Sequence, residues 1–438
     1  MDFWKSLPSL EFPAPLPQTL LAAEQHLNAP EIGDVAQAVL MALRQSTWLE
    51  RIASAERIAI GVGSRGISNL PLVVRTVVAE LKRRGAVPFV FPAMGSHGGA
   101  TAEGQRDMLA ELGVTEESVG APILATMEVL PVGELPGGPQ LFQDANAASA
   151  DHTVLINRIK PHTDFRGELE SGLSKMAVIG MGKRRGAEAM HAFGGAGFQR
   201  FLAPAARVYE ENSNLIGGIA ILENAYGHTA RIEALSAHEI GAQREKDLLV
   251  EARGLMGSLP FEHIDVLVVR EMGKNISGTG MDTNIIGRLR IPRQPEDFGG
   301  PDVAVLVVLD LTAQAEGNAS GMGLANITTA RLVEKIDWNA TYTNTITSGI
   351  FGMLRGQLPI TMADDRRALQ VALRGCAVPP AEARLALITN TKDLDHLWIS
   401  PSLKAEAEQN PRLRLIGEVP LAFDAQGRMT SPWAFADA

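Results

Sequence analysis

The stretch Arg57-Ile-Ala-Ile-Gly-Val62 runs directly into Gly63-Ser-Arg-Gly66, and apolar residues at helical spacing follow from Leu70 to Arg84. A short apolar run bounded by glycine is typical of a buried β-strand, and the period of the residues after the loop is that of an amphipathic helix. We therefore predict a strand–loop–helix unit whose loop carries a serine and an arginine.

The same pattern recurs along the chain. A predicted strand over Val87 to Phe91 is followed by the loop Ala93-Met-Gly-Ser-His97 and by a helix from about Thr101 to Leu112, and further strands are predicted over Thr153 to Asn157 and Ile216 to Leu222. Strands that alternate with helices indicate an α/β fold with a mostly parallel sheet, in which ligands bind beyond the carboxyl ends of the strands. The loops after these strands are therefore the expected place for a site.

A glycine-rich segment from Gly254 to Pro260 indicates a domain boundary, and the length of 438 residues also favours two domains. We predict an N-terminal catalytic and cofactor-binding domain over residues 1–260 and a C-terminal substrate-closing domain over residues 261–438. Each is expected to be α/β, with a mostly parallel sheet flanked by helices, and the active site to lie in the interdomain cleft. For about the last 20 residues, packing against the first domain is the alternative to packing within the second. Further predicted elements are helices over Gln18–His26, Asp34–Arg44, Ser236–Arg253, Thr328–Lys335 and Asp364–Arg374, and strands over Val266–Val269, Val303–Leu309 and Leu385–Asn390.

Composition narrows the class of protein. The formal net charge is −10, which gives no broad attraction to nucleic acid, and Cys376 is the single cysteine, so a disulfide framework or a cysteine-based zinc or iron–sulfur site is not expected. The N-terminal residues lack the pattern of a signal peptide, and the longest apolar run, Val303 to Leu311, is too short to span a bilayer. We expect a cytoplasmic protein with neither a membrane nor a nucleic-acid partner; the sequence does not fix its oligomeric state.

Lys175 is the sharpest candidate for chemistry. It stands among small residues, thirteen positions after His162 and sixteen before His191. Small neighbours leave room around the amine, and the apolar run Met176 to Ile179 can desolvate it, which favours the neutral, nucleophilic form. We predict a reactive lysine bracketed by two imidazoles.

Other candidates lie in glycine-rich surroundings. His97 leaves a flexible turn, and Arg65 after Ser64 can grip a carboxylate or phosphate because adjacent backbone N–H groups are free to help. Lys183 and Arg184 can also contact phosphate, with a solvated basic helix start as the alternative. We expect Ser64, Arg65, Lys183 and Arg184 to take part in cofactor binding.

Taken together, these segments resemble the lactate racemase family, the nickel-pincer nucleotide enzymes that racemise or epimerise 2-hydroxy acids. The resemblance covers most of the chain and rests on the loops of Arg65, His97 and Pro161-His162 and on the pair Lys175 and His191. It departs at Gly63-Ser-Arg-Gly66, which lacks the family's acidic residue and proline, in extra residues before Lys175, and in the loop after Met272.

The resemblance implies a cofactor and roles for these residues. Lys175 would be joined through a thioamide to the nickel-pincer nucleotide, pyridinium-3,5-bisthiocarboxylic acid mononucleotide, whose two sulfurs and one ring carbon hold nickel, and His191 would complete a roughly square-planar metal site. His97 and His162 would be paired acid/base residues, and the loop of Arg65 would hold anions. Inverting a carbinol carbon needs a base on each side and a hydride acceptor between them. Enzymes that make this cofactor are implied as partners.

The departures point to the substrate. Arg166 lies in the extra residues before Lys175, and the segment Lys274 to Asn284 is dense in Lys, Asn, Ser, Thr and Asp. So many donors and acceptors predict more substrate oxygens than lactate offers, since unpaired buried polar groups would be costly. We predict a sugar acid or another polar 2-hydroxy acid as substrate, with Arg166, Lys274, Asn275 and Trp398 binding it.

Two other classes stay open at this point. Lys175 could form a Schiff base, with or without pyridoxal phosphate, and reduction by borohydride would trap the imine. The chain could also be a nickel- or cofactor-binding protein without turnover, which would hold metal and leave C2 of the substrate unchanged.

Overall fold

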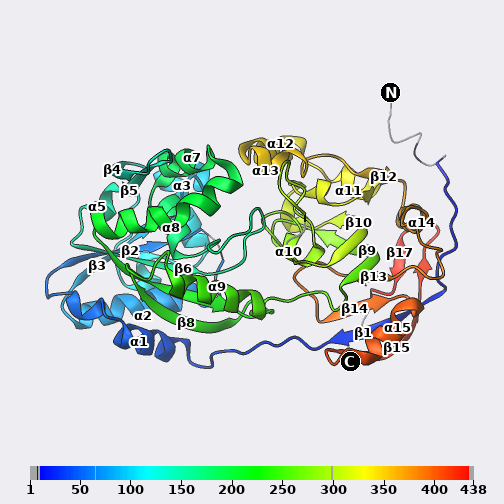
Figure 1. The fold of residues 1–438 in the computed structure, drawn as a ribbon, viewed down its shortest axis with the longest axis horizontal. Helices are drawn as coiled ribbons and strands as arrows, with labels where there is room; N and C mark the ends of the chain where they lie inside the picture. Colours follow the sequence, from blue (N-terminus) through cyan, green and yellow to red (C-terminus); the bar gives the residue numbers. More distant parts are fainter. Residues whose placement is uncertain (1–6, 8–9, 65, 297–298, 434–438) are drawn as a thin grey trace. The chain divides into compact units, whose positions relative to one another are not determined.

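The computed structural model describes residues 7, 10–64, 66–296 and 299–433 (Figure 1). The chain divides into two compact units. One unit is continuous, Asn28–Met256, and will be called the central unit. The other joins the residues up to Leu27 to those from Gly257 onward and will be called the terminal unit.

The central unit is built on a five-stranded sheet with the order β3-β2-β6-β7-β8. Strands β2, β3, β6 and β7 are parallel, and β8 pairs antiparallel with β7 at one edge. A second, two-stranded sheet is formed by β4 and β5. The strands are β2 Arg57–Val62, β3 Val87–Pro92, β4 Val129–Glu134, β5 Gln140–Asp144, β6 His152–Arg158, β7 Leu215–Glu223 and β8 Thr229–Ser236.

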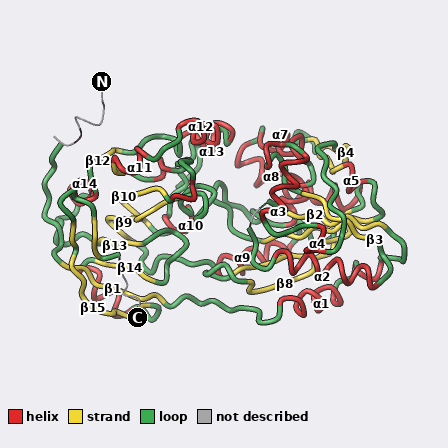
Figure 2. Tube along the Cα trace, turned by 180° about the vertical axis from the view of Figure 1, so that it is seen from behind, coloured by secondary structure: helices red, strands yellow, loops and turns green. Residues whose placement is uncertain are grey.

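Helices cover both faces of this sheet because the strands are apolar on both sides. Ile58 and Ile60 of β2 pack into one buried cluster with α1 and α2, whereas Ala59 packs into another with α8 and α9. Figures 1 and 2 show α2 and α8 on opposite faces. The helices are α1 Val35–Gln45, α2 Leu70–Arg83, α3 Ala102–Glu111, α4 Glu116–Val119, α5 Ala145–Ala148, α6 Leu173–Lys175, a π-helix Met176–Gly180, α7 Lys183–His191, α8 Gly194–Asn212 and α9 Gln243–Leu255.

The terminal unit contains an eight-stranded sheet with the order β12-β11-β10-β9-β13-β14-β1-β15. Strands β9 to β13 are mutually parallel, and β14, β1 and β15 add antiparallel pairs. The strands are β1 Thr19–Gln25, β9 His263–Met272, β10 Asp302–Leu311, β11 Ile327–Thr329, β12 Ile360–Met362, β13 Leu385–Ile388, β14 His396–Ile399 and β15 Leu413–Pro420, with a separate pair β16 Ala422–Phe423 and β17 Met429–Ser431.

One face of this sheet packs against α14, whose Ala368, Leu369 and Leu373 join Val266 and Val307 of the strands in a buried cluster. The helices of the terminal unit are α10 Thr283–Ile286, α11 Ala330–Glu334, α12 Trp338–Thr347, α13 Ile350–Met353, α14 Asp365–Gly375 and α15 Lys404–Gln409. The prediction of an α/β protein with mostly parallel sheets flanked by helices is confirmed, with antiparallel strands at an edge of each main sheet.

The structure differs from the sequence prediction in the first 27 residues. The predicted helix Gln18–His26 is the strand β1, which pairs on one side with β14 and on the other with β15. These long-range pairings override the local pattern, because strand preference depends mainly on the neighbours a strand acquires. The residues up to Leu27 therefore group with the terminal unit, and Met429 near the C-terminus packs in the core of that same unit.

A second difference concerns the predicted helix Ser236–Arg253. The chain stays extended through β8 as far as Ser236, and α9 begins at Gln243. A turn with Gly241 at a φ of +74° separates the two elements, a backbone conformation that glycine adopts at little cost.

Candidate active site

Three of the predicted site residues follow neighbouring parallel strands of the central unit. Ser64 follows β2, His97 follows β3 and His162 follows β6, and these strands lie side by side in the sheet. Carboxyl ends of parallel strands share one edge, so the three loops meet there. Arg65 lies outside the described residues.

The loop of His97 is held in a fixed conformation. Gly95 and Gly98, on either side of the histidine, have φ values of +61° and +62°. A Cβ at Gly98 would lie 2.7 Å from the backbone nitrogen of Gln105, so the loop packs against the start of α3 more closely than a side chain allows. The Oγ atom of Ser64 contacts Nδ1 of the exposed His97 ring, which orients the imidazole.

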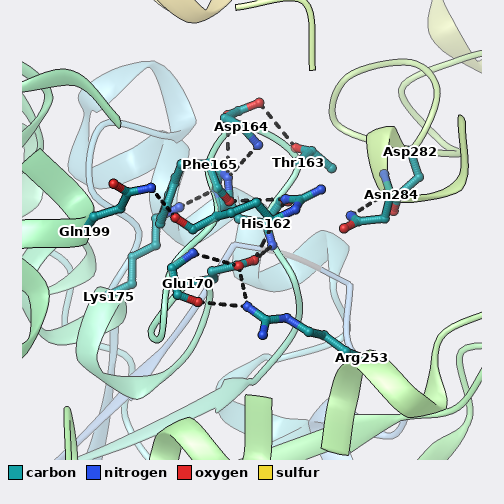
Figure 3. Close-up of polar contacts among 12 residues, drawn as sticks. His162, Thr163, Asp164, Phe165, Glu170, Lys175, Gln199, Arg253, Asp282 and Asn284 are labelled. Carbon is teal, nitrogen blue, oxygen red and sulfur yellow. Dashed lines mark hydrogen bonds and ion pairs between the residues drawn. The ribbon is translucent and has the colours of Figure 1, made fainter. Parts of the chain in front are cut away.

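His162 contacts Lys175 directly, as Figure 3 shows. Nδ1 of His162 accepts a hydrogen bond from the backbone N–H of Asp164 at 3.0 Å, so in the neutral ring Nε2 carries the proton. Nε2 lies 2.5 Å from Nζ of Lys175. The contact joins an imidazole nitrogen to the lysine amine, so a proton can be shared between the two groups.

Aromatic rings connect the two histidines around this lysine. The ring of His162 stacks on Phe165 with centroids 4.6 Å apart, Phe165 stacks on Phe198 at 4.9 Å, and Phe198 meets His191 edge to face at 5.2 Å. Nζ of Lys175 lies 5.3 Å from the Phe165 ring centroid and 5.4 Å from that of Phe198. The structure therefore brings His162, Lys175 and His191 together, as the sequence predicted.

The protonation of His191 is set by these surroundings. Loss of hydration lowers the pKa of its imidazole, and a protonated Lys175 nearby would lower that pKa further, whereas Asp164 acts in the opposite sense. A histidine with a lowered pKa stays neutral at physiological pH, and the neutral ring is the form that binds metals. Its place at the end of α7 leaves the ring partly accessible.

The loop from His162 to Glu170 is organised by a buried carboxylate. Glu170 accepts hydrogen bonds from the backbone N–H groups of His162 at 2.5 Å and Gly167 at 3.1 Å, and it pairs with Arg253 of α9 at 2.7 Å (Figure 3). Arg166 donates to the carbonyl oxygens of His162 and Phe165. The contacts of Arg166 thus hold the histidine loop, and its binding of substrate stays a prediction.

The backbone around Lys175 is anchored by a second buried carboxyl group. Oε1 of Glu245 accepts from the backbone N–H of Ser174 at 3.0 Å and from its hydroxyl at 3.2 Å, and Oε2 accepts from the N–H of Gly241 at 2.7 Å. Burial raises the pKa of Glu245, and the hydrogen bonds it accepts act in the opposite sense. A π-helix follows Lys175, and this rare form is frequent at functional sites.

Two residues predicted to bind the cofactor phosphate have different surroundings. Lys183 is fully buried, where Nζ lies 3.0 Å from Asp144, so its expected contact with phosphate does not agree with the structure. The prediction erred because a basic residue at a helix start was taken to face solvent, whereas Lys183 turns inward beneath α7. Arg184 is exposed and pairs with Glu188 one turn along α7 at 2.7 Å. Its contact with phosphate stays a prediction.

The polar loop after β9 lies in the terminal unit, and several of its groups bond to one another. Nζ of Lys274 donates to the carbonyl of Gly278 at 2.7 Å, and the amide oxygen of Asn275 accepts from the hydroxyl of Thr312 at 2.7 Å. Other bonds within or from this loop are Ser277 with Thr279 at 3.2 Å, Thr279 to Met281 at 2.6 Å, Asn284 to Asp282 at 2.7 Å and Asp282 to Thr391 at 2.9 Å. Several of these polar side chains therefore stabilise the loop itself, so their number is weaker support for a substrate richer in oxygen than lactate.

Trp398 was predicted to bind substrate, and the structure contradicts this. It lies in β14 with 1% of its surface exposed and packs in the core of the terminal unit, where its ring meets Trp433 edge to face at 5.4 Å. An aromatic residue inside an apolar strand is a core residue by pattern.

Several residues of the site were missed by sequence reasoning. Phe165 and Phe198 form the aromatic walls, and Glu170, Glu245 and Gln105 fix the loops. Phe165 and Glu170 lie in the extra residues before Lys175, where an unusual insertion was the available signal. Phe198 and Glu245 reach the site only through the packing of α8 and α9, so nothing local marks them.

Within the described ranges, no group of three or more His, Cys, Asp or Glu side chains is placed to hold a metal ion. In the same part of the chain, no helix combines the length and the apolar run needed to cross a bilayer.

Comparison with known proteins identifies the fold. No protein-family model matches the chain, and no curated protein matches it. Among solved structures, the lactate racemase apoprotein from Thermoanaerobacterium thermosaccharolyticum is similar over 88% of this chain and 99% of its own, with a TM-score of 0.52 and 13% identity. A structural-genomics protein from Thermotoga maritima matches 63% of this chain and 70% of its own at a TM-score of 0.43 and 13% identity. The chain therefore has the fold of a lactate racemase apoprotein.

Proposed function

We propose that this protein is a nickel-dependent racemase or epimerase that inverts C2 of a 2-hydroxy acid, with a nickel-pincer nucleotide carried on Lys175. The observation that carries the proposal is the contact of the Lys175 amine with His162, with His191 beside it across Phe198. The fold shared with a lactate racemase apoprotein supports the same reading.

The residues present fit such a cofactor. Attachment to a lysine requires an amine that can lose its proton, and the amine of Lys175 lies against the imidazole of His162. Since the cofactor would bring its own soft ligands, one neutral imidazole, that of His191, is the donor the chain needs to add. When bound, the group would supply a hydride acceptor for the substrate carbon.

The chain's own residues would move the protons. His162 would pass a proton to or from a substrate hydroxyl, and the carboxylate of Asp164, 3.7 Å from Nδ1, would stabilise the imidazolium form of the ring. His97, oriented by Ser64, would do the same for the other hand of the substrate. Phe165 and Phe198, which stack on each other beside Lys175, would keep water from the side of the amine that they cover.

For the substrate, we propose a 2-hydroxy carboxylic acid, with sugar acids and dicarboxylic hydroxy acids ahead of lactate. Arg166, Lys274 and Asn275 are the proposed contacts. The bonds that Lys274 and Asn275 make to neighbouring groups reduce the number of donors left to select a substrate, so a direct comparison of substrates is needed.

Two measurements test the proposal. Protein produced together with the enzymes that make the cofactor should show an intact-mass increase that maps to Lys175 and disappears in Lys175→Ala. That loaded protein is then assayed with lactate, malate, 2-hydroxyglutarate and aldonic acids by chiral chromatography. An unmodified lysine, or a modified protein that leaves every C2 centre unchanged, would contradict the proposed enzyme.

A Schiff-base enzyme is the second candidate, because the amine of Lys175, once it has lost its proton, would also attack a carbonyl carbon. Borohydride added to protein with pyridoxal phosphate or an oxo acid would then leave a stable adduct on Lys175. A protein that binds nickel and cofactor without turnover would give the mass increase and the metal, and no inversion.

A further inference from the structure

Beneath the loop of His97 lies a buried polar cluster that the proposed reaction does not use. Lys183, at the first position of α7, has no exposed surface, and its ammonium group lies 3.0 Å from a carboxylate oxygen of Asp144 and 3.0 Å from Oε1 of Gln105. It also donates to the backbone carbonyl of Pro92, the last residue of β3. This one side chain joins four elements: β3, β5, α3 and α7.

Gln105 passes the connection on to the histidine loop. It is fully buried in α3, where its Oε1 accepts from Lys183 and its Nε2 donates to the carbonyl oxygens of Gly95 at 2.9 Å and His97 at 3.2 Å. A side-chain amide is the group that can accept at one end and donate twice at the other. Because Lys183 donates to Oε1, a flip of the amide would place its NH2 group against the ammonium group of Lys183. The amide orientation is thereby fixed, with Nε2 directed toward the loop of His97.

The cluster is costly to keep for stability alone. Lys183 has a φ of +52°, a backbone conformation that is uncommon for a residue with a side chain. A buried ion pair is, moreover, weak support for stability, because well-packed apolar residues of the same volume often serve as well or better. Its geometric effect is specific: through Gln105, the contacts connect α7, whose last residue is His191, to the backbone carbonyls of Gly95 and His97.

We propose that Gln105, fixed by the pair Lys183 and Asp144, is a positioning residue that sets the backbone, and so the ring, of His97. This inference rests on the proposed function, because it takes His97 as an acid/base residue. Gln105 itself touches neither substrate nor cofactor in this scheme, and it acts only through the loop that it holds.

The central variant is Gln105→Met, which keeps the length of the side chain and removes its hydrogen bonds. Gln143→Met is the matched control, since Gln143 is also buried in the central unit and donates to Thr153 and Asn214 at the opposite ends of the strands. In cofactor-loaded protein, Gln105→Met should lower kcat and kcat/KM together by roughly 10²-fold, the loss typical of a catalytic group misplaced by about 1 Å. Gln143→Met should leave both parameters near those of the parent.

A double-mutant cycle separates positioning from general damage. In the His97→Ala background, Gln105→Met should cause no further loss of turnover, because the residue on which it acts is gone. An equal loss in the two backgrounds would overturn the proposal, as would a Gln105→Met enzyme with parent-like kcat.

A second readout does not depend on activity. Hydrogen exchange at the backbone amides of Gly95 and His97 should be faster in Gln105→Met than in the parent or in Gln143→Met, because the loop loses two of its contacts. If the parent inverts no 2-hydroxy acid, the proposed function fails while this measurement still decides the positioning. Unchanged exchange at those two amides would overturn it.

Discussion

The carboxyl group of Glu245 offers a quantitative test of how the lysine segment is held. Glu245→Leu keeps a similar side-chain volume and removes the acceptor for two backbone N–H groups, those of Ser174 and Gly241, and for the hydroxyl of Ser174. A buried donor left without a partner costs about 1–3 kcal/mol, so two such donors cost about 2–6 kcal/mol. The replacement also ends the burial of a carboxyl group, which offsets part of this cost. We expect a net loss of about 2–4 kcal/mol.

Hydrogen exchange of the core amides of β6 and β7 as a function of urea measures this loss, because those amides exchange only when the central unit unfolds. Glu251→Leu is the matched control on the same helix, since Glu251 is partly exposed and pairs with Arg231 at 2.9 Å. Such a pair contributes about 0–1 kcal/mol. If Glu245→Leu costs no more than Glu251→Leu, the assignment of Glu245 as the anchor of this segment is wrong.

The same residue predicts a dependence on pH. Burial raises the pKa of Glu245 in the folded protein above its usual 4.5, so folding favours the protonated carboxyl group. The contribution of this group to the unfolding free energy is therefore present in full below pH 4.5 and is lost as the pH rises through the raised pKa. Glu245→Gln removes this titration. As the pH is raised from about 4, the unfolding free energy of the parent should therefore fall relative to that of Glu245→Gln. A difference that is constant with pH would contradict the raised pKa.

Three further predictions concern the buried pair and the histidines. Lys183→Met should lower the unfolding free energy by about 3–5 kcal/mol because it leaves Asp144 buried without its partner, and adding Asp144→Asn should restore most of that loss in thermal denaturation. His97→Ala and His162→Ala should each lower turnover of the loaded enzyme by roughly 10²–10⁴-fold, and a near-normal rate in either variant would rule out paired acid/base roles. His191→Ala should release nickel, by elemental analysis, while the mass adduct on the lysine persists; unchanged nickel would give the ring a structural role.

The sequence predicted those parts of the fold that local pattern determines. Strands β2, β3, β6 and β7 were predicted because each is a short apolar run bounded by turn residues, and the loops after three of them carry site residues. Strand β1 was taken as a helix because its seven residues gain their strand character from β14 and β15, which lie far along the chain. Strands β4, β5 and β8 have mixed burial or short length and gave no clear period.

The candidate site divides in the same way. The sequence indicated Lys175 because its neighbours are small residues that include glycine, and because a histidine lies on either side of it along the chain. The structure brings the three side chains together. Lys183 and Arg184 show the limit of such reasoning, because they are adjacent basic residues at the start of one helix. Lys183 is buried in the core, whereas Arg184 is exposed to solvent. Whether a polar side chain faces its own backbone, as in the loop of Lys274, also depends on tertiary packing.

The position of β1 has a consequence for how the protein is made. The central unit is one uninterrupted segment, so it can fold while the rest of the chain is still on the ribosome. Strand β1, synthesised earlier, pairs with β14 and β15, which are among the last strands to emerge. Its apolar residues Leu20 to Ala23 must stay without those partners for most of the translation time, as an unpaired strand open to non-native pairing. Nascent chains stalled before β14 should therefore depend on chaperones far more than chains released after β15.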